Sequence, residues 1–425
     1  MIHCEKNKKK YNIAAISSNY NFNIMNYRHC IFLPVVVLFF LFPRESYSQK
    51  NEYNYPEFDF SKGIGIKSPD SSFFLNFGFR FQPRISYTSA DLEVFDFGNI
   101  EARIRRLRLK FNGYVFDPKV AYKIELAFEN TSLDLEEASL PNIILDAVVF
   151  YNPNENWSFS FGQTKLPGNR ERVISSGNLE MVDRTYVNSR FNIDRDMGIQ
   201  AHYTNNVNNF YYAVKGAISS GEGRNFITTD EGLAYTGRVE ILPLGKFENK
   251  GDYSMGDFER EKTPKLGLGF TAHTNQNAIR QRGQTGRFLY EPRDLTSFFL
   301  DMMFKYNGWA VMAEYDTRST NDPITVNEDG DIRYVYVGKG TWFQGSYVFK
   351  RNWSLIGRLT FLFPDQEISD YTDQINEYAV GIAKYIRGHK FKVQADIAYN
   401  DRYNSYREQL VEDNWQIRFQ VEIGI

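Results

Sequence analysis

The amino-acid sequence predicts an all-β fold: a transmembrane antiparallel β-barrel of about 16 strands with short periplasmic turns and long extracellular loops. Apolar and polar residues alternate along most of the chain, which indicates strands with one apolar and one polar face. The alternating segments run for about 10 residues or more, the length that a tilted strand needs to cross a bilayer. Short and long connections follow one another, as the two rims of such a barrel require.

The composition argues against a helical membrane protein. Aromatic residues make up 16% of the chain, with 36 Phe and 28 Tyr, yet the mean hydropathy of −0.48 is that of a soluble protein. A barrel reconciles the two values, because its strands expose apolar residues on one face only. The formal net charge of −2 gives no electrostatic reason to bind a polyanion, so we expect no nucleic-acid partner.

The C-terminal stretch DNWQIRFQVEIGI carries the alternation to the last residue. A chain end is usually frayed and polar, whereas Trp415 to Ile425 alternate without a break. In a closed barrel the last strand pairs with the first, so an apolar end that faces lipid is expected. A soluble β-sandwich protein also alternates, but its strands usually run for about 5–6 residues.

Three segments refine this interpretation. Segment 143–152 is apolar on both faces and is the weakest predicted strand. Asn112-Gly113 is a hairpin signal, but the alternation runs through it, so we expect one strand there and a turn at 117–119. Connection 243–263 lies where a short turn is expected and breaks the rule by its length. Long connections are expected at 87–101, 131–142, 166–195, 220–231, 275–294, 320–337, 364–375 and 401–412.

The N-terminal part of the chain has the features of an export signal. Residues 31–42 form an apolar run that is too short to cross a bilayer as a helix. Arg28 precedes the run, and the small residues Ser46 and Ser48 follow it. This order is typical of a secretory signal peptide with cleavage after Ser48.

The domain organisation that we expect follows from this cleavage. The three parts are a signal peptide at 1–48, an N-terminal periplasmic segment at 49–70, and a barrel at 71–425 with an inward-folded loop at 166–195. Met25 is an alternative start, because the segment before the apolar run is long for a signal peptide. Cys4 and Cys30 both precede the cleavage, so the exported chain would contain no cysteine.

Two stretches carry a family resemblance. The first is IRRLRLKFNGYVFDPKVAYKIELAF (104–128), and the second is FGQTKLPGNRERVISSGNLEMVDRTYVNSRFNIDRDMGIQ (161–200). The second contains Gly-Gln, Lys-x-Pro, a Ser-Ser step, Met-x-Asp-Arg, and Arg-Asp before Gly-Ile. Both resemble the phosphate-selective porin O/P family, and the similarity continues more loosely to the C-terminal strand.

The resemblance implies a function and a location. It implies an outer-membrane porin of a Gram-negative bacterium, through which small hydrophilic solutes diffuse passively. It also implies a homotrimer with no cofactor, surrounded by outer-membrane lipid. We expect the outer-membrane assembly machinery to bind the C-terminal strand.

The inward face of the predicted barrel is rich in basic residues. If the apolar faces contact lipid, the lumen is lined by Arg80, Arg84, Arg106, Arg108, Lys110, Arg238 and Arg358, among others. The first two strands supply five of these groups and no acid. Arginine binds phosphate with two donors at once and stays charged, and rings of Arg or Lys select anions in pores. The pattern favours an anion-conducting lumen that accepts small anions such as phosphate.

The loop 166–195 is the longest connection and is expected to narrow the pore. Its candidate constriction residues, with the lysine that precedes it, are Lys165, Arg170, Arg172, Glu180, Asp183, Arg184 and Arg195. Its acids, which also include Glu171 and Asp194, could neutralise the arginines of the wall. In that case the protein would be a general, weakly selective porin.

Two other classes of function remain as alternatives. An outer-membrane enzyme would need a nucleophile, a base and an orienting group. After the signal peptide the histidines are His202, His273 and His389, and none has a recognisable serine or carboxylate spacing. We therefore expect no catalytic site and no metal site. A binding or adhesin barrel would instead use the long loops to hold a partner.

Overall fold

The structure is a computed structural model that describes residues 56–59, 63–90, 93, 96, 99–128, 143–227, 232–404 and 409–425. The expected signal peptide at 1–48 lies outside the described residues and stays a prediction. Among the described residues, no helix is long and apolar enough to span a membrane.

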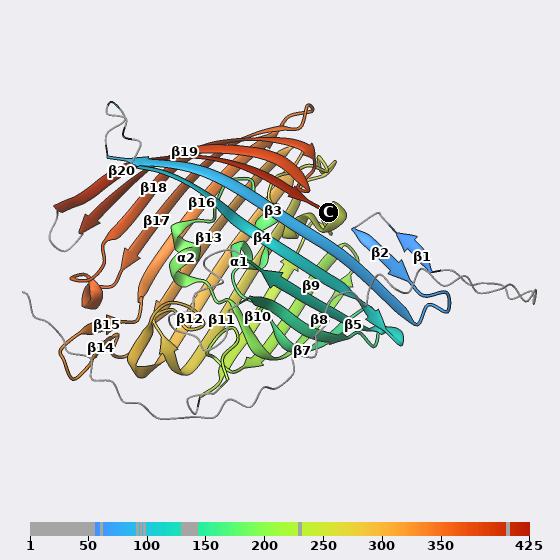
Figure 1. Cartoon of the computed structure of the whole chain (residues 1–425), viewed down its shortest axis with the longest axis horizontal. Coiled ribbons are helices and arrows are strands. Elements are labelled where there is room, and N and C mark those ends of the chain that lie inside the picture. The colour runs from blue at the N-terminus through green and yellow to red at the C-terminus, as the bar shows by residue number, and fades with distance from the viewer. Residues whose placement is uncertain are drawn as a thin grey trace, which may run out of the picture. The chain divides into compact units, whose positions relative to one another are not determined.

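Sixteen strands form a closed antiparallel barrel, which confirms the predicted fold (Figure 1). They are β3 (Phe73–Ser89), β4 (Ile100–Val115), β5 (Asp117–Ala127), β6 (Ile144–Tyr151), β7 (Trp157–Lys165), β8 (Arg195–Val207), β9 (Phe210–Ser219), β10 (Ala234–Leu242), β11 (Lys265–Arg280), β12 (Phe288–Tyr306), β13 (Trp309–Ser319), β16 (Gly338–Val348), β17 (Trp353–Pro364), β18 (Gln374–Arg387), β19 (Phe391–Asn404) and β20 (Gln409–Gly424). Each strand pairs with the next along the chain, and β20 pairs with β3 to close the barrel.

The remaining elements are short. They are β1 (Glu57–Asp59), β2 (Ile64–Lys67), β14 (Ile324–Val326), β15 (Ile332–Tyr334), the α-helices α1 (Arg170–Val173) and α2 (Tyr186–Phe191), and the 3-10 helices η4 (Ser176–Asn178), η5 (Glu248–Tyr253) and η6 (Gln366–Ile368). The hairpin of β14 and β15 forms a sheet of its own.

The C-terminus is held in the barrel as the alternation predicts. The ladder between β20 and β3 runs from Trp415 opposite Ser89 to Gly424 opposite Arg80. The backbone N–H of Ile425 donates to the carbonyl oxygen of Phe79 at 3.1 Å. Where β20 ends, β2 takes its place beside β3 (Figure 1). The segment 49–70 therefore includes residues that belong to the sheet.

The strand predictions succeed in most details. Segment 143–152 contains strand β6, and β4 runs through Asn112-Gly113 as one strand. The turn after β4 lies at Phe116, which has a φ of 66°, and not at 117–119. Asp117 already pairs with Val115, so β5 begins directly after Phe116.

The expected long loops at 275–294 and 401–412 are wrong in their extent, and β19 pairs with β20 as far as Asn404 opposite Gln409. The ladder between β11 and β12 continues to Arg280 opposite Phe288, across bulges near Ala278. Only residues 281–287 connect these two strands. The sequence did not predict this pairing, because residues 275–294 are largely polar. They lie where β11 and β12 extend beyond the apolar belt of the barrel.

The two faces of the strands differ as a membrane barrel requires. On the outer face, the side chains of Phe161 and Ile199 are 61% and 60% exposed. On the inner face, polar and charged side chains are buried, because segments of the chain fill part of the lumen. The functional residues are therefore expected in the lumen.

Candidate pore constriction

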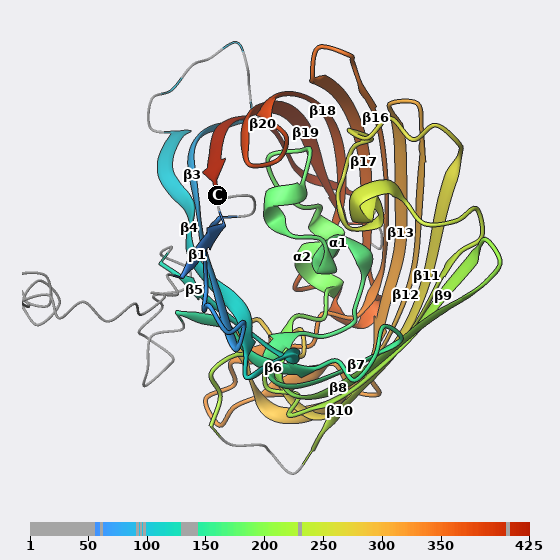
Figure 2. The same cartoon turned by 90° about the vertical axis from the view of Figure 1, so that its right-hand side faces the viewer.

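The loop 166–195, which we call the constriction loop, leaves β7 and returns to β8. Its two helices, α1 and α2, lie inside the ring of strands (Figure 2). Thr185 caps α2, since its Oγ1 accepts a hydrogen bond from the backbone N–H of Asn188 at 3.0 Å. The loop carries a row of apolar residues that would not suit a solvated surface loop. These are Leu166, Ile174, Leu179, Val187, Phe191 and Ile193, all at most 2% exposed.

The apolar residues of the constriction loop pack on an apolar patch of the inner wall. This patch lies on β12, β13, β16 and β17 and consists of Leu295, Phe299, Met303, Met312, Trp342 and Leu362. Burial of apolar surface drives this docking. The loop is therefore fixed to one side of the barrel.

Charged wall residues tie the backbone of the constriction loop. Arg318 donates to the carbonyl oxygens of Arg190 and Phe191 at the end of α2, at 2.8 and 2.9 Å. Lys392 donates to the carbonyl oxygens of Gly177 and Leu179 at 2.8 and 2.6 Å. Such bonds from charged groups are stronger than neutral ones. They hold the loop in a defined position across the lumen.

On the opposite side, β3 and β4 present a column of basic residues to the lumen. Arg80 lies directly opposite Arg108, and Arg84 lies opposite Arg103. Lys110 is the next inward residue toward the periplasmic turn, opposite Gly78. The expected lumen residues of these two strands therefore form one continuous track.

A β-bulge adds an arginine that alternation alone does not predict. Strict alternation places Arg105 with the outward Leu107, but the ladder skips a residue between Gln82–Arg106 and Pro83–Ile104. A bulge of this kind re-aims a side chain. Arg105 consequently points into the lumen, where its Nε lies 3.2 Å from Asp183.

Asp183 of the constriction loop connects the loop to this track. Its carboxylate lies 2.8 Å from Arg84, 3.2 Å from Arg105 and 3.2 Å from Arg106. Burial raises the pKa of Asp183, but the charges of Arg105, Arg106 and Arg84 outweigh it and hold the pKa well below its ordinary value. One carboxylate is thus shared by three guanidinium groups.

The other acids of the constriction loop do not pair with the β3 and β4 arginines. Glu171 accepts hydrogen bonds from Thr185 within the loop, at 3.0 and 2.6 Å. Glu180 accepts from Ser354 at 2.9 Å. Asp194 pairs with Arg172 and Arg195. Neutralisation of the wall by the loop is therefore limited to one carboxylate.

A polar cavity of about 530 Å³ opens between the track and the constriction loop. Its lining includes eight arginines: Arg84, Arg103, Arg105, Arg106, Arg172, Arg184, Arg282 and Arg418. Among the residues that the structure describes, the carboxylates that line the same cavity are those of Glu101, Asp183 and Glu377. Its wall therefore carries an excess of positive charge.

Burial and the positive charge around the cavity lower the pKa of Arg184 in the constriction loop. Its guanidinium donates to the carbonyl oxygens of Glu171 and Ile174 at 3.0 and 2.7 Å. Burial and the neighbouring charge of Arg172 lower the pKa of Arg184 to about 9, although Glu171 and Asp183 oppose the shift. An anion in the cavity would relieve this repulsion.

Lys165 and Arg195 oppose each other at the ends of β7 and β8. Alternation groups Lys165 with the apolar face, but its Nζ donates inward to the carbonyl oxygens of Arg172 and Val173 at 2.6 and 3.0 Å. Arg195 pairs with Asp146 at 3.1 Å. Both side chains bend toward the lumen because they lie at the rim, where the loop begins and ends.

Three other expected site residues are buried and, unlike the similarly buried Arg84 and Arg106, do not line the polar cavity. Arg238 is bound to Asp301 at 2.6 Å and is 2% exposed. Arg170 of the loop binds the same carboxylate at 2.6 Å. Arg358 pairs with Glu377 at 2.9 Å and is also 2% exposed. These three arginines hold the constriction loop and do not belong to the track.

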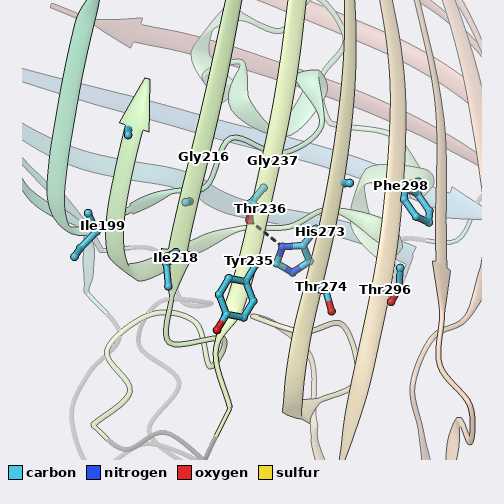
Figure 3. A pocket seen from close by; sticks show the side chains of 13 residues that line it. Ile199, Gly216, Ile218, Tyr235, Thr236, Gly237, His273, Thr274, Thr296 and Phe298 are labelled. Carbon is cyan, nitrogen blue, oxygen red and sulfur yellow. Dashed lines mark hydrogen bonds between the residues drawn. The ribbon is translucent and has the colours of Figure 1, made fainter. Parts of the chain in front are cut away.

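Another cavity, of about 730 Å³, lies on the outer surface of the barrel (Figure 3). Gly216 and Gly237 pair across β9 and β10, and neither has an atom near the position of a Cβ. The outward side chains of Ile218, Tyr235 and Phe298 lie around these two glycines. Almost all of its lining is apolar, so this groove faces lipid and is separate from the pore.

Comparison with known proteins identifies the family. Residues 77–420 match the family described as phosphate-selective porin O and P. The chain belongs to this family. No curated protein sequence is significantly similar to this porin. The family and the fold make the protein a porin channel of the Gram-negative outer membrane.

Solved structures share the fold of this porin. The outer membrane channel DcaP of Acinetobacter baumannii has a TM-score of 0.51 at 14% identity, covering 86% of this chain and 100% of that chain. Salmonella typhi OmpF in complex with daunomycin has a TM-score of 0.51 at 9% identity, covering 83% of this chain and 98% of that chain. At these identities the comparison supports the fold alone.

Proposed function

We propose that this porin conducts small anions preferentially, along a track formed by Arg80, Arg84, Arg105, Arg106, Arg108 and Lys110. The observation that carries the proposal is the excess of arginines around the cavity beside Asp183. An anion that leaves water there exchanges part of its hydration for charge-assisted hydrogen bonds. Several such sites in series let the ion move without a deep trap.

The accessible charges support a passage along β3, β4 and β5. The side chains of Arg80 and Lys123 are 24% and 25% exposed, and Lys110 is exposed. Glu125 pairs with Arg108 at 3.4 Å and with Lys123 at 3.2 Å. The preference for anions is consequently graded along the passage, strongest near Asp183 and weaker toward the periplasm.

Phosphate is the specific anion that we propose. The guanidinium groups of Arg84, Arg105 and Arg106 converge on one carboxylate, and phosphate oxygens accept the same fork of donors. The alternative is a general anion-preferring porin, in which chloride and phosphate pass without discrimination. A weakly selective porin is the remaining outcome if the wall acids Glu125 and Glu422 cancel the track.

A planar-bilayer recording separates these outcomes. In a potassium chloride gradient, the reversal potential of the parent should indicate preference for chloride. Changing Arg106 and Arg108 together to Glu should shift it toward potassium, more strongly at low salt, where screening is weak. Millimolar phosphate should block the chloride current of the parent and not that of the double variant. A parent without ion preference would refute the proposal, and a preference without block would leave only the general anion porin.

We further propose that the porin is a homotrimer in outer-membrane lipid and that the assembly machinery binds strand β20. The family resemblance supports the trimer, and the apolar outer face supports the lipid contact. The outward Phe419 and Ile423 support recognition of the last strand. Chemical cross-linking of intact outer membranes tests the trimer, since a monomeric band alone would contradict it.

A further inference from the structure

The connection between β10 and β11, residues 243–264, is out of place for a periplasmic turn. We call it the inner turn segment. It lies on the rim where the neighbouring connections are two-residue turns, at 208–209 and 307–308. It contains the 3-10 helix η5 and many more residues than a reversal needs. This length indicates a role beyond reversing the chain.

The inner turn segment crosses the periplasmic opening of the barrel. Asp257 accepts a hydrogen bond at 2.7 Å from the backbone N–H of Gly308, in the β12–β13 turn. Arg260 donates at 2.6 Å to the carbonyl oxygen of Val348, at the end of β16. The ring of Phe258 packs against Tyr385 of β18, with centroids 4.1 Å apart. The segment therefore extends from β10 to the far side of the barrel.

The segment also enters the lumen and meets the constriction loop. Met255 is 2% exposed, and its backbone N–H donates to the carbonyl oxygen of Asn178 at 2.9 Å. The Nδ2 of Asn178 donates back to the carbonyl oxygen of Tyr253 at 3.3 Å. Arg170 donates to the carbonyl oxygen of Asp252 at 3.0 Å. The two segments thus support each other from opposite rims.

Wall residues of β10 and β12 bind the inner turn segment. Lys305 of β12 is 2% exposed and donates to the carbonyl oxygens of Gly251 and Ser254, both at 2.8 Å. The hydroxyl of Tyr253 donates to Glu240 of β10 at 2.7 Å. Charged groups that would otherwise face a water-filled lumen are thus occupied by the segment.

We propose that the inner turn segment is a fixed periplasmic plug. It closes the part of the lumen lined by β10 to β19 and positions the constriction loop from below. Solutes then leave the pore along the rest of the wall, past Arg80 and Lys110 on β3 and β4 and beside the cavity of about 750 Å³ that Lys215 and Asp252 line. The proposal concerns the route through the porin and holds whichever ion the porin prefers.

Conductance tests the route. Replacing residues 244–263 by Asn-Gly, a two-residue hairpin turn, should open a second path in parallel with the first. Two parallel paths of similar width would roughly double the single-channel conductance. The control shortens the β14–β15 hairpin by replacing 327–331 with Asn-Gly on the extracellular rim, which should leave the conductance unchanged. An unchanged conductance in a correctly assembled plug variant would overturn the proposal.

Cysteine accessibility tests the same point in a chain that keeps the segment. The described residues contain no cysteine, and Cys4 and Cys30 precede the expected cleavage. A Cβ at Gly267 of β11 would lie 3.5 Å from the Phe247 ring, directly beneath the plug. Gly267→Cys should therefore resist a charged thiol reagent, whereas Asn112→Cys on β4 should react. Equal reaction at both positions would refute the plug even if the deletion variant failed to assemble.

Discussion

The carboxylate of Asp183 lies 2.8 Å from Nη1 of Arg84 and links the constriction loop to the first strand of the barrel. The apolar side chains of the loop pack on the opposite side, on the apolar patch of β12 to β17, where Arg318 also binds the end of α2. The loop therefore spans the lumen and is held by both charged and apolar contacts. The contact at Asp183 borders the passage, whereas the apolar packing is closed to water.

Removing the charge of Asp183 should strengthen the preference for anions. Asp183→Asn leaves three guanidinium groups without their shared carboxylate. A unit charge at about 4 Å in water changes an ion's energy by roughly 1 kcal/mol, or about fivefold in permeability ratio. The reversal potential in a salt gradient measures this change. Asp331→Asn, on the extracellular β14–β15 hairpin, is the matched control and should behave like the parent.

The ion pairs between Asp183 and the arginines of β3 and β4 should also persist at low pH. Because the arginines hold the pKa of Asp183 well below its ordinary value of 3.8, the ionised form favours the docked loop at every pH above that value. The stabilisation is lost only as the pH falls through the lowered pKa. The part of the current noise that depends on Asp183, taken as the difference between the parent and Asp183→Asn, should stay constant from neutral pH to about pH 4. A rise in noise near pH 5 that is absent from Asp183→Asn would contradict the assignment.

The bulge on β4 makes a prediction of its own. If Arg105 faces the lumen, Arg105→Ser should reduce the anion preference about as much as Arg106→Ser does. A residue facing lipid would have no such effect on the current. Arg351→Ser, in the exposed turn between β16 and β17, controls for the loss of one positive charge. If Arg105→Ser conducts like this control, the bulge does not direct the side chain inward.

The alternation also predicts which positions tolerate charge. Leu109 faces lipid, and Asn112, three residues further along β4, faces the lumen. An arginine on the lipid face near the bilayer midplane costs roughly 2–4 kcal/mol. Leu109→Arg should therefore impair assembly, and Asn112→Arg should not. The heat-dependent gel mobility of folded barrels measures assembly, and similar yields of the two variants would refute the register.

The sequence predicted the barrel because alternation is a local signal that lipid on one side enforces in every strand. It did not predict the bulge, although the apolar residues of β4 change from even to odd positions between Ile104 and Leu107, which marks one extra residue there. The prediction also took no account of the apolar residues at inward positions, such as Phe299 and Met303 of β12. An apolar side chain facing the lumen has to be covered. That signal, together with the length of 243–263, could have indicated that two segments fill the lumen.

The apolar attachment yields the last prediction. Phe191 ends α2, is fully buried, and packs edge-on against Tyr336 with ring centroids 5.5 Å apart. Truncating a buried phenylalanine to alanine costs about 3–5 kcal/mol in a well-packed core. In Phe191→Ala that cost falls on the docking of the loop, because the strands keep their ladder hydrogen bonds.

The barrel of Phe191→Ala should therefore assemble, while its channel shows larger and more variable conductance as the loop leaves the wall. Phe161→Ala removes the same ring from the lipid-facing side of β7, where the side chain is 61% exposed, and is the matched control. Single-channel recordings compare the size and the steadiness of the conductance in Phe191→Ala and Phe161→Ala. Equally steady currents would mean that Arg318, Lys392 and Asp183 suffice to hold the loop without its apolar contacts.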